Sequence, residues 1–244
     1  MNRKIGVLDS GIGGFTILEE LKKELPNESF IYYKDTKNIP YGDKTEEEIY
    51  LNTKKIIEEL IKQNIKLIVI ACNSISTTLL KKFKEEYKDI IFIGTVPPIK
   101  VACDKDYKNI LVMATKITVN SNRIKEIIND NKKDKQNITL LDCSGLVELI
   151  EKKDNNLIND KLNEIFKDYL NTSIDCIVLG CTHYPLIKEN ISNIFRDANI
   201  LESTDGVVKE VKRQLNLNNL QNFNNKQTIE IIDYKGWLYG QKVL

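Results

Sequence analysis

Short runs of apolar residues alternate with longer charged stretches along the chain. Seven runs are rich in β-branched side chains and show no polar alternation: 5–8, 30–33, 67–70, 90–93, 110–113, 138–141 and 177–179. Strands that are covered on both faces of a sheet have this continuous apolar pattern. The pattern therefore predicts buried strands at these positions.

Helical patterns lie between the apolar runs. Residues 15–25 carry Leu18, Leu21 and Leu25 on one face and Glu or Lys on the other. Residues 45–63 begin with Thr45-Glu46-Glu47-Glu48, which is typical of a capping box with acids in the first turn. Alternating strands and helices favour right-handed βαβ units and mostly parallel sheets. We therefore predict a doubly wound α/β fold.

A long-period repeat divides the chain into two halves. Residues 67–74 resemble residues 176–183, since each segment is a buried strand, a small residue, a cysteine and then hydroxyl or amide side chains. Cys72 and Cys181 are 109 positions apart (181 − 72). An earlier predicted strand also precedes each cysteine at a similar distance. The first leads to Asp9, 63 positions before Cys72 (72 − 9), and the second leads to Thr115, 66 positions before Cys181 (181 − 115). The repeat predicts two similar, pseudo-symmetric α/β domains.

The repeat also predicts where the domains divide and where they bind a ligand. We expect a first domain of residues 1–96 plus 206–244 and a second of residues 97–205, with the active site in the cleft between them. Open α/β sheets bind ligands beyond the carboxyl ends of their strands, where the strand order reverses. Each domain is therefore expected to present its cysteine at such a point.

The charge balance and the cysteine spacing exclude several classes of protein. The 244 residues include 36 Lys and Arg against 35 Asp and Glu, so the basic excess of a nucleic-acid binder is missing. No apolar run approaches the roughly 20 residues that span a bilayer, and the polar N-terminus lacks the apolar segment of a signal peptide. Five scattered cysteines favour reduced thiols. We expect a cytoplasmic protein without nucleic-acid or membrane partners.

Cys72 and Cys181 are the first candidates for chemistry. A single cysteine at a strand end more often serves packing. Each of these two, however, follows a strand and precedes a predicted helix, whose N-terminus would lower the thiol pKa from about 8.5 toward neutrality. The matched settings favour a reactive pair. Cys103, Cys143 and Cys176 lack such a setting and are interpreted as structural.

Asp9 and His183 lie beside these cysteines in the predicted fold. Asp9 opens the turn Asp-Ser-Gly-Ile-Gly-Gly (9–14), whose glycines let backbone N–H groups approach an anion. Thr16 stands where a dinucleotide fingerprint needs glycine, so the turn is weak evidence for a nucleotide site. His183, the only histidine, is a candidate acid–base partner of Cys181. With one histidine and no Cys-x-x-Cys pair, we expect no metal site.

Five segments in order resemble the aspartate/glutamate racemase family over residues 5–206. They are Asp-Ser-Gly-Ile-Gly-Gly (9–14), Pro-Tyr-Gly (40–42), Ala-Cys-Asn-Ser (71–74), Ala-Thr-Lys-Ile-Thr (114–118) and Leu-Gly-Cys-Thr-His-Tyr-Pro (179–185). The last segment is the most specific. The resemblance implies a racemase without a cofactor, which converts L-glutamate to D-glutamate for peptidoglycan with one cysteine on each face of the α-carbon.

The same resemblance implies a role for each matching residue. Cys72, assisted by Asp9, would act on the D-isomer, and Cys181, assisted by His183, on the L-isomer. Glu151 matches a family acid that supports the second half-site, although an exposed helical acid fits that position equally well. The substrate's α-amino and α-carboxylate groups would be held by Ser10, Asn73, Ser74 and Thr182. Its side-chain carboxylate would be held by Tyr41, Gly42, Thr115 and Thr118. The family is often dimeric, so a homodimer is compatible with the sequence.

Three other functions stay open at this stage. One is a racemase for aspartate or another amino acid on the same scaffold, although Cys-Thr-His-Tyr-Pro favours the glutamate branch over the Cys-Thr-Glu of the aspartate branch. Another is a non-catalytic amino-acid-binding protein, against which the paired cysteines argue. A Cys–His–Asp hydrolase uses the same residue types but leaves the second cysteine unexplained. Residues 237–244 match no motif.

Overall fold

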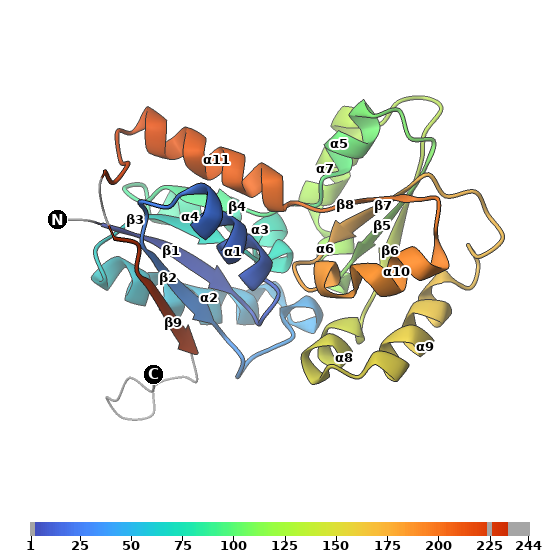
Figure 1. Ribbon diagram of the computed structural model, residues 1–244, viewed down its shortest axis with the longest axis horizontal. Coiled ribbons are helices and arrows are strands. Elements are labelled where there is room, and N and C mark those ends of the chain that lie inside the picture. Colours follow the sequence, from blue (N-terminus) through green and yellow to red (C-terminus); the bar gives the residue numbers. More distant parts are fainter. Residues whose placement is uncertain (1–2, 224–225, 234–244) are drawn as a thin grey trace.

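The strands of the protein form two separate parallel sheets (Figure 1). The computed structural model describes residues 3–223 and 226–233. Sheet A has the strand order β4-β3-β1-β2-β9, and sheet B has the order β6-β5-β7-β8. Every strand pair in the described residues is parallel. The predicted α/β class with mostly parallel sheets is therefore confirmed.

The strands correspond closely to the apolar runs of the sequence. Sheet A contains β1 (Lys4–Asp9), β2 (Phe30–Lys34), β3 (Ile65–Ile70), β4 (Phe92–Gly94) and β9 (Ile229–Asp233). Sheet B contains β5 (Asn109–Ala114), β6 (Asn137–Asp142), β7 (Cys176–Gly180) and β8 (Asn199–Leu201). Each of the seven predicted strands is present, with β4 displaced by two residues at its start.

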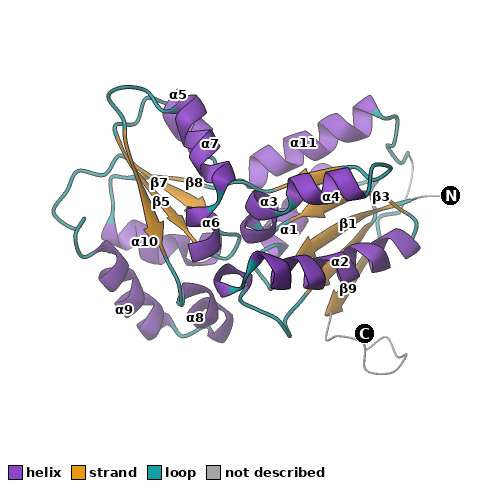
Figure 2. Ribbon diagram, turned by 180° about the vertical axis from the view of Figure 1, so that it is seen from behind, coloured by secondary structure: helices purple, strands orange, loops and turns teal. Residues whose placement is uncertain are grey.

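The helices pack on both faces of each sheet (Figure 2). Beside sheet A lie α1 (Phe15–Glu24), η1 (Tyr41–Asp43), α2 (Glu46–Lys62), α3 (Asn73–Thr78), α4 (Leu80–Glu86) and α11 (Thr204–Leu217). Beside sheet B lie α5 (Ile99–Asp104), α6 (Lys116–Asn120), α7 (Asn122–Asn131), α8 (Leu146–Lys152), α9 (Asn155–Phe166), η2 (Tyr184–Ile187) and α10 (Lys188–Ile194).

Each sheet has two apolar cores, one on each face. On sheet A, α2, α3 and α4 contribute to one core, and α1 and α11 contribute to the other. On sheet B, α8, α9 and α10 pack on one face, and α5 and α7 pack on the opposite face. All six residues of β3 are buried as a result. Two-sided burial explains why the central strands read as unbroken apolar runs.

Local sequence signals set the helix boundaries as predicted. At the start of α2, the Thr45 hydroxyl accepts a hydrogen bond from the Glu48 backbone N–H, and the Glu48 carboxylate accepts one from the Thr45 N–H. This capping box satisfies N–H groups that the first helical turn leaves free. On α1, Leu18 and Leu21 are buried against sheet A.

Strands β8 and β9 have no counterpart among the predicted strands. β8 has only three residues, and β9 is an edge strand whose Ile229 and Ile231 are exposed. Strand β9 gains its place by pairing in parallel with β2, more than 190 residues earlier in the chain (for example Phe30 with Ile229). A strand that depends on a distant partner leaves little periodic signal in its own sequence.

The two sheets repeat one topology, as the sequence repeat predicts. β1, β2, β3 and β4 occupy the same relative order in sheet A as β5, β6, β7 and β8 in sheet B, and β9 is an addition at the edge of sheet A. The strand order reverses between β1 and β3, and again between β5 and β7. A division at residues 96 and 206 would separate the two sheets. The assignment of domains itself stays a prediction.

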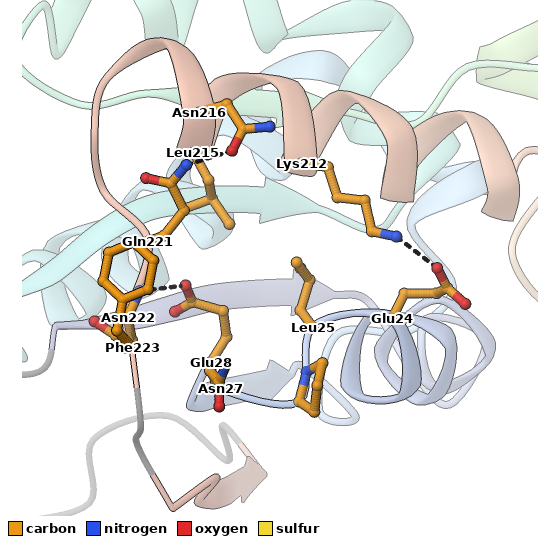
Figure 3. A pocket seen from close by; sticks show the side chains of 11 residues that line it. Glu24, Leu25, Asn27, Glu28, Lys212, Leu215, Asn216, Gln221, Asn222 and Phe223 are labelled. Atoms are coloured by element: carbon orange, nitrogen blue, oxygen red, sulfur yellow. Dashed lines mark hydrogen bonds and ion pairs between the residues drawn. The ribbon is translucent and has the colours of Figure 1, made fainter.

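A buried ion pair binds Leu220 and Asn222, which follow α11. The Lys66 ammonium lies 2.5 Å from the Glu28 carboxylate, with side chains 1% and 3% exposed. Lys66 also donates to the Leu220 carbonyl at 2.6 Å, and the Asn222 N–H donates to Glu28 at 2.9 Å. Beside this pair is a cavity of about 330 Å³ between α1 and α11 (Figure 3). It lies near the amino end of β2, so it is remote from the strand ends that carry the candidate residues.

Two further expectations concern the cysteines and the membrane. All five cysteines are buried and free. Within residues 3–223 and 226–233, no helix has the length and apolar character needed to cross a membrane. The unmatched residues 237–244 lie outside the described part of the chain.

Candidate active site

Asp9 and Cys72 meet at the reversal point of sheet A. Asp9 is the last residue of β1, and Cys72 follows β3 and immediately precedes α3. Both side chains are buried. The Gly14 N–H donates to the Asp9 carboxylate at 2.6 Å, and the Cys72 thiol lies 3.8 Å from the Ser10 hydroxyl. The first half-site is therefore a thiol and a carboxylate on adjacent strand ends.

The Cys72 thiol is protonated at neutral pH. Burial raises the pKa of Cys72, and the Asp9 carboxylate raises it further, although the Ile75 N–H of α3 lowers it. The predicted lowering of the Cys72 pKa by the helix N-terminus is therefore wrong. Loss of hydration outweighs the helix N–H groups, because a thiolate without solvent is costly. Burial also raises the pKa of Asp9, against the opposing charge of His183.

Cys181, His183 and Glu151 form the second half-site at the end of β7. His183 Nδ1 lies 3.8 Å from Cys181 Sγ, and His183 Nε2 lies 2.7 Å from Glu151 Oε1. Burial lowers the pKa of His183, but the hydrogen bonds to Cys181 and Glu151 outweigh it and raise this pKa to about 10. His183 is therefore an imidazolium at neutral pH.

Two groups of the protein contact the same oxygen of Glu151, Oε1. Its side chain is 20% exposed and accepts a hydrogen bond from the Ile12 N–H at 2.9 Å in addition to the contact with His183. Burial raises the pKa of Glu151, but these two hydrogen bonds bring it below its usual value. The interpretation of Glu151 as an exposed helical acid is wrong, because α8 directs it toward the loop after β1. Its part in the reaction stays a prediction.

The two half-sites face one another. The Thr182 hydroxyl, next to Cys181, lies 3.5 Å from the Asp9 carboxylate. Asp9 also lies within reach of His183, whose charge opposes the rise in the pKa of Asp9. Residues from the carboxyl ends of both sheets therefore share one site.

The glycines of the turn after β1 allow this close approach. A Cβ atom on Gly11 would lie 2.2 Å from Glu151 Oε1, and one on Gly13 would lie 2.6 Å from the backbone nitrogen of His183. At Gly13 the neighbour is backbone, so no side chain fits there, whereas at Gly11 a side chain would have to displace the Glu151 carboxylate. The anions that the turn's N–H groups approach are the protein's own carboxylates, Glu151 through Ile12 and Asp9 through Gly14.

A second group of candidate residues forms a chain of hydroxyls between the sheets. Ser74 Oγ lies 3.0 Å from Thr115 Oγ1, and the Thr115 hydroxyl donates to Thr118 at 3.0 Å. Gly42 adjoins them, since a Cβ there would lie 2.5 Å from Thr115 Cβ. The family resemblance assigns Ser74 to a different substrate group from Thr115 and Thr118, but the structure brings all three together.

Two candidate binding residues already have partners on the protein. The Tyr41 hydroxyl is buried and donates to the Asp35 carboxylate at 2.6 Å. The Asn73 amide donates to the Thr95 carbonyl at 3.3 Å, which leaves its Oδ1 without a partner. Sequence reasoning missed Asp35, which is fully buried. The sequence feature that could have identified Asp35 is its position just after a predicted strand, which it shares with Asp9.

No group of three His, Cys, Asp or Glu side chains in the described ranges is arranged to hold a metal ion. Cys103, Cys143 and Cys176 are buried within the cores of sheet B. The chemistry available at the site is therefore a pair of thiols, each beside its own acid–base group, with hydroxyl and backbone N–H donors around them.

Comparison with known proteins identifies the family of this architecture. The chain is 41% identical over 231 residues to a glutamate racemase of Clostridium acetobutylicum, covering 93% of this chain and 89% of the relative. The structure of Francisella tularensis glutamate racemase in complex with D-glutamate matches with a TM-score of 0.85 and 32% identity, covering 97% of this chain and 90% of the other.

An Escherichia coli glutamate racemase, solved with L-glutamate and the activator UDP-MurNAc-ala, matches with a TM-score of 0.81 and 27% identity over 94% of this chain and 89% of the other. The family model for Asp/Glu/Hydantoin racemase matches residues 6–211, which include every candidate residue of the two half-sites. The chain therefore belongs to the Asp/Glu/Hydantoin racemase family.

Proposed function

We propose that the chain racemises glutamate by moving protons between the α-carbon and two thiols, Cys72 and Cys181. Its full-length relatives are glutamate racemases, and glutamate is the substrate bound in two of the similar structures. Racemisation of glutamate is therefore the activity, and the family's role is to supply D-glutamate for peptidoglycan. The observation that carries the mechanism is the pair of cysteines at equivalent reversal points of two facing sheets.

The two half-sites are prepared for opposite roles. Cys72 is a protonated thiol because burial and Asp9 raise its pKa. Cys181 faces the His183 imidazolium, whose positive charge stabilises a sulfur that acts as a base. In the L-to-D direction, Cys181 accepts the proton as the Cα–H bond of L-glutamate breaks. Cys72 then gives its thiol proton to the opposite face of the same carbon, and the configuration is inverted.

The carbanion between these two transfers requires stabilisation by the protein. We assign the α-amino and α-carboxylate groups to Ser10, Asn73 and Thr182. Asn73 supports this assignment, since its buried Oδ1 is free to accept a hydrogen bond from an ammonium group. Fixed donors near a developing negative charge stabilise it without reorganisation. The chain's own residues supply acid, base and donors, and we propose that no cofactor takes part.

The side-chain carboxylate of glutamate is assigned to Gly42, Thr115 and Thr118, together with Ser74. Their hydroxyl chain and the backbone N–H of the turn are donors, which suits an anion. Because the Tyr41 hydroxyl is bound to Asp35, Tyr41 contributes through its backbone and its ring. Aspartate, one methylene shorter, would reach this set less well.

Racemisation in deuterated water tests the proposed function. Purified protein, without added pyridoxal phosphate and with a metal chelator present, is incubated with L- or D-glutamate. Optical rotation should decay to zero from either enantiomer, and deuterium should replace the α-proton. A Cys103→Ala variant, changed at a buried cysteine far from the site, should behave like the wild type. Rotation that persists for glutamate would disprove the proposal, and faster decay for aspartate would reassign the substrate.

The site's setting in the cell is part of the same proposal. Five free thiols, two of them essential, suit a reducing compartment, so we propose that the enzyme works in the cytoplasm. A homodimer is compatible with the family and stays a prediction.

A further inference from the structure

Asp35 is a buried carboxylate that the proposed chemistry does not use. It follows β2 and has no exposed surface. The Asn38 amide donates to both of its oxygens at 2.9 Å, and the Tyr41 hydroxyl donates to Oδ2 at 2.6 Å. Its own N–H donates to the Asp9 carbonyl at 3.1 Å. The Asn38 amide and the Tyr41 hydroxyl thus give the carboxylate three hydrogen bonds in place of its lost hydration.

These bonds connect the catalytic half-site to the turn that carries Gly42. On one side, Asp35 is tied to Asp9, which neighbours Cys72. On the other side, its bond to Tyr41 fixes the residue that begins η1, directly before Gly42. Gly42 in turn packs so closely on Thr115 that a Cβ would lie 2.5 Å away. Asp35 thus links the two, through its backbone N–H to the strand end and through its carboxylate to the turn.

We propose that Asp35 is a positioning residue that sets the distance between the α-carbon site and the donors for the substrate's side-chain carboxylate. The proposal rests on the proposed function, because it assigns Gly42 and Thr115 to that carboxylate. Asp35 acts through Tyr41 and does not touch the substrate. It is therefore a determinant of substrate length, which favours glutamate over its shorter homologue aspartate.

The physical reason is the strength and the direction of the buried bond. A hydrogen bond from a hydroxyl to a charged carboxylate is stronger than one between two neutral groups. Because the carboxylate is buried, losing this bond leaves it without a replacement from water, which is costly. Without this bond, η1 keeps the packing of the Tyr41 ring and of Gly42 on Thr115, but it loses its hydrogen bond to the end of β2. The Gly42 N–H then occupies a range of positions, and binding of the distal carboxylate weakens. The proton transfers at the α-carbon keep their geometry.

Two variants and their combination test the proposal. Tyr41→Phe keeps the ring and removes only the hydroxyl, and Asp35→Asn keeps the shape and removes the charge. Each should raise KM for L- and D-glutamate by the same factor of about 10, with kcat changed much less. The preference for glutamate over aspartate in kcat/KM should fall. The double variant should match the single ones, because both remove the same bond.

A matched control separates positioning from general stability. The Tyr50 hydroxyl on α2 donates to the Glu86 carboxylate at 2.8 Å, the same chemistry at a surface position. Tyr50→Phe should leave KM for glutamate unchanged. An unchanged KM in Tyr41→Phe, or effects that multiply in the double variant, would overturn the role of Asp35. A wild-type chain that fails to racemise glutamate would instead overturn the proposed function.

Discussion

His183 lies 2.7 Å from Glu151, and this contact joins the loop after β7 to helix α8. The other nitrogen of the same imidazole faces Cys181 at 3.8 Å. The Glu151 carboxylate therefore stabilises the positive charge of the His183 ring and orients this ring toward the Cys181 thiol. Carboxylate–imidazole pairs of this kind fix which nitrogens carry protons.

The first prediction concerns the protonation of His183. Its pKa is raised from 6.5 to about 10, so above pH 6.5 the native protein holds a proton that the unfolded chain releases. This group's stabilisation is complete below pH 6.5 and is lost as the pH rises through about 10. As His183 is the only histidine, a single imidazole NMR signal should titrate near pH 10 in the wild type. In Glu151→Gln it should titrate at lower pH.

Stability measurements give an independent check of the same pair. The free energy of unfolding, measured in urea from pH 6.5 to 10, should decline more in the wild type than in Glu151→Gln, because the variant has less bound charge to lose. Glu151→Asp, which retains the charge, should behave more like the wild type. A wild-type imidazole signal that titrates near 6.5 would show that the pair does not hold the proton.

The second prediction separates the roles of the two thiols. Cys72→Ala and Cys181→Ala should each lose racemisation by a factor of about 10²–10⁴, because inversion needs a base on one face and an acid on the other. In deuterated water, Cys72→Ala should still exchange the α-proton of L-glutamate slowly, with retention, through Cys181. Cys181→Ala should do the same only with D-glutamate. Equal exchange of both enantiomers by either variant would contradict the assignment of faces.

The third prediction concerns the close approach at Gly11. A methyl group there would lie 2.2 Å from Glu151 Oε1, so Gly11→Ala should displace the Glu151–His183 pair and reduce kcat. The matched control is Gly206→Ala on α11, where a Cβ meets nothing within 4 Å. That change should leave activity intact and raise the free energy of unfolding by about 0.5–1 kcal/mol, the helix preference of alanine over glycine. Full activity in Gly11→Ala would show that a methyl group at this position does not displace the Glu151–His183 pair.

The fourth prediction concerns the buried ion pair Lys66–Glu28, which binds Leu220 and Asn222 after α11. Lys66→Met leaves the Glu28 carboxylate buried without its cation. The free energy of unfolding should therefore fall by about 3–5 kcal/mol. Adding Glu28→Gln should recover much of this loss, since it removes the charge and keeps an acceptor for the Asn222 N–H.

An exposed ion pair provides the comparison for this fourth prediction. In the pair Lys62–Glu59, the lysine side chain is 67% exposed. Lys62→Met should therefore change stability little, because solvent already screens that pair. Equal losses in Lys62→Met and Lys66→Met, measured by urea unfolding, would contradict the importance of burial.

The sequence by itself determined the central strands, the duplicated topology and the identity of both cysteines. These features are local or periodic: β3 is buried along its whole length, and the segments around Cys72 and Cys181 share one pattern. The capping box at Thr45 belongs to the same class, because its partners are three residues apart. The sequence pattern did not predict strand β9, because this strand depends on pairing with β2 across most of the chain.

The tertiary structure decided the electrostatics of the site. The pKa of Cys72 is raised where a helix N-terminus predicted a lower value, because burial depends on everything packed around the thiol. Glu151 and Asp35 acquire their partners only when separate elements pack together. Short-range patterns fix which residues end each strand, whereas hydration and charge depend on distances between residues that are remote in the chain, and only the folded structure sets those distances.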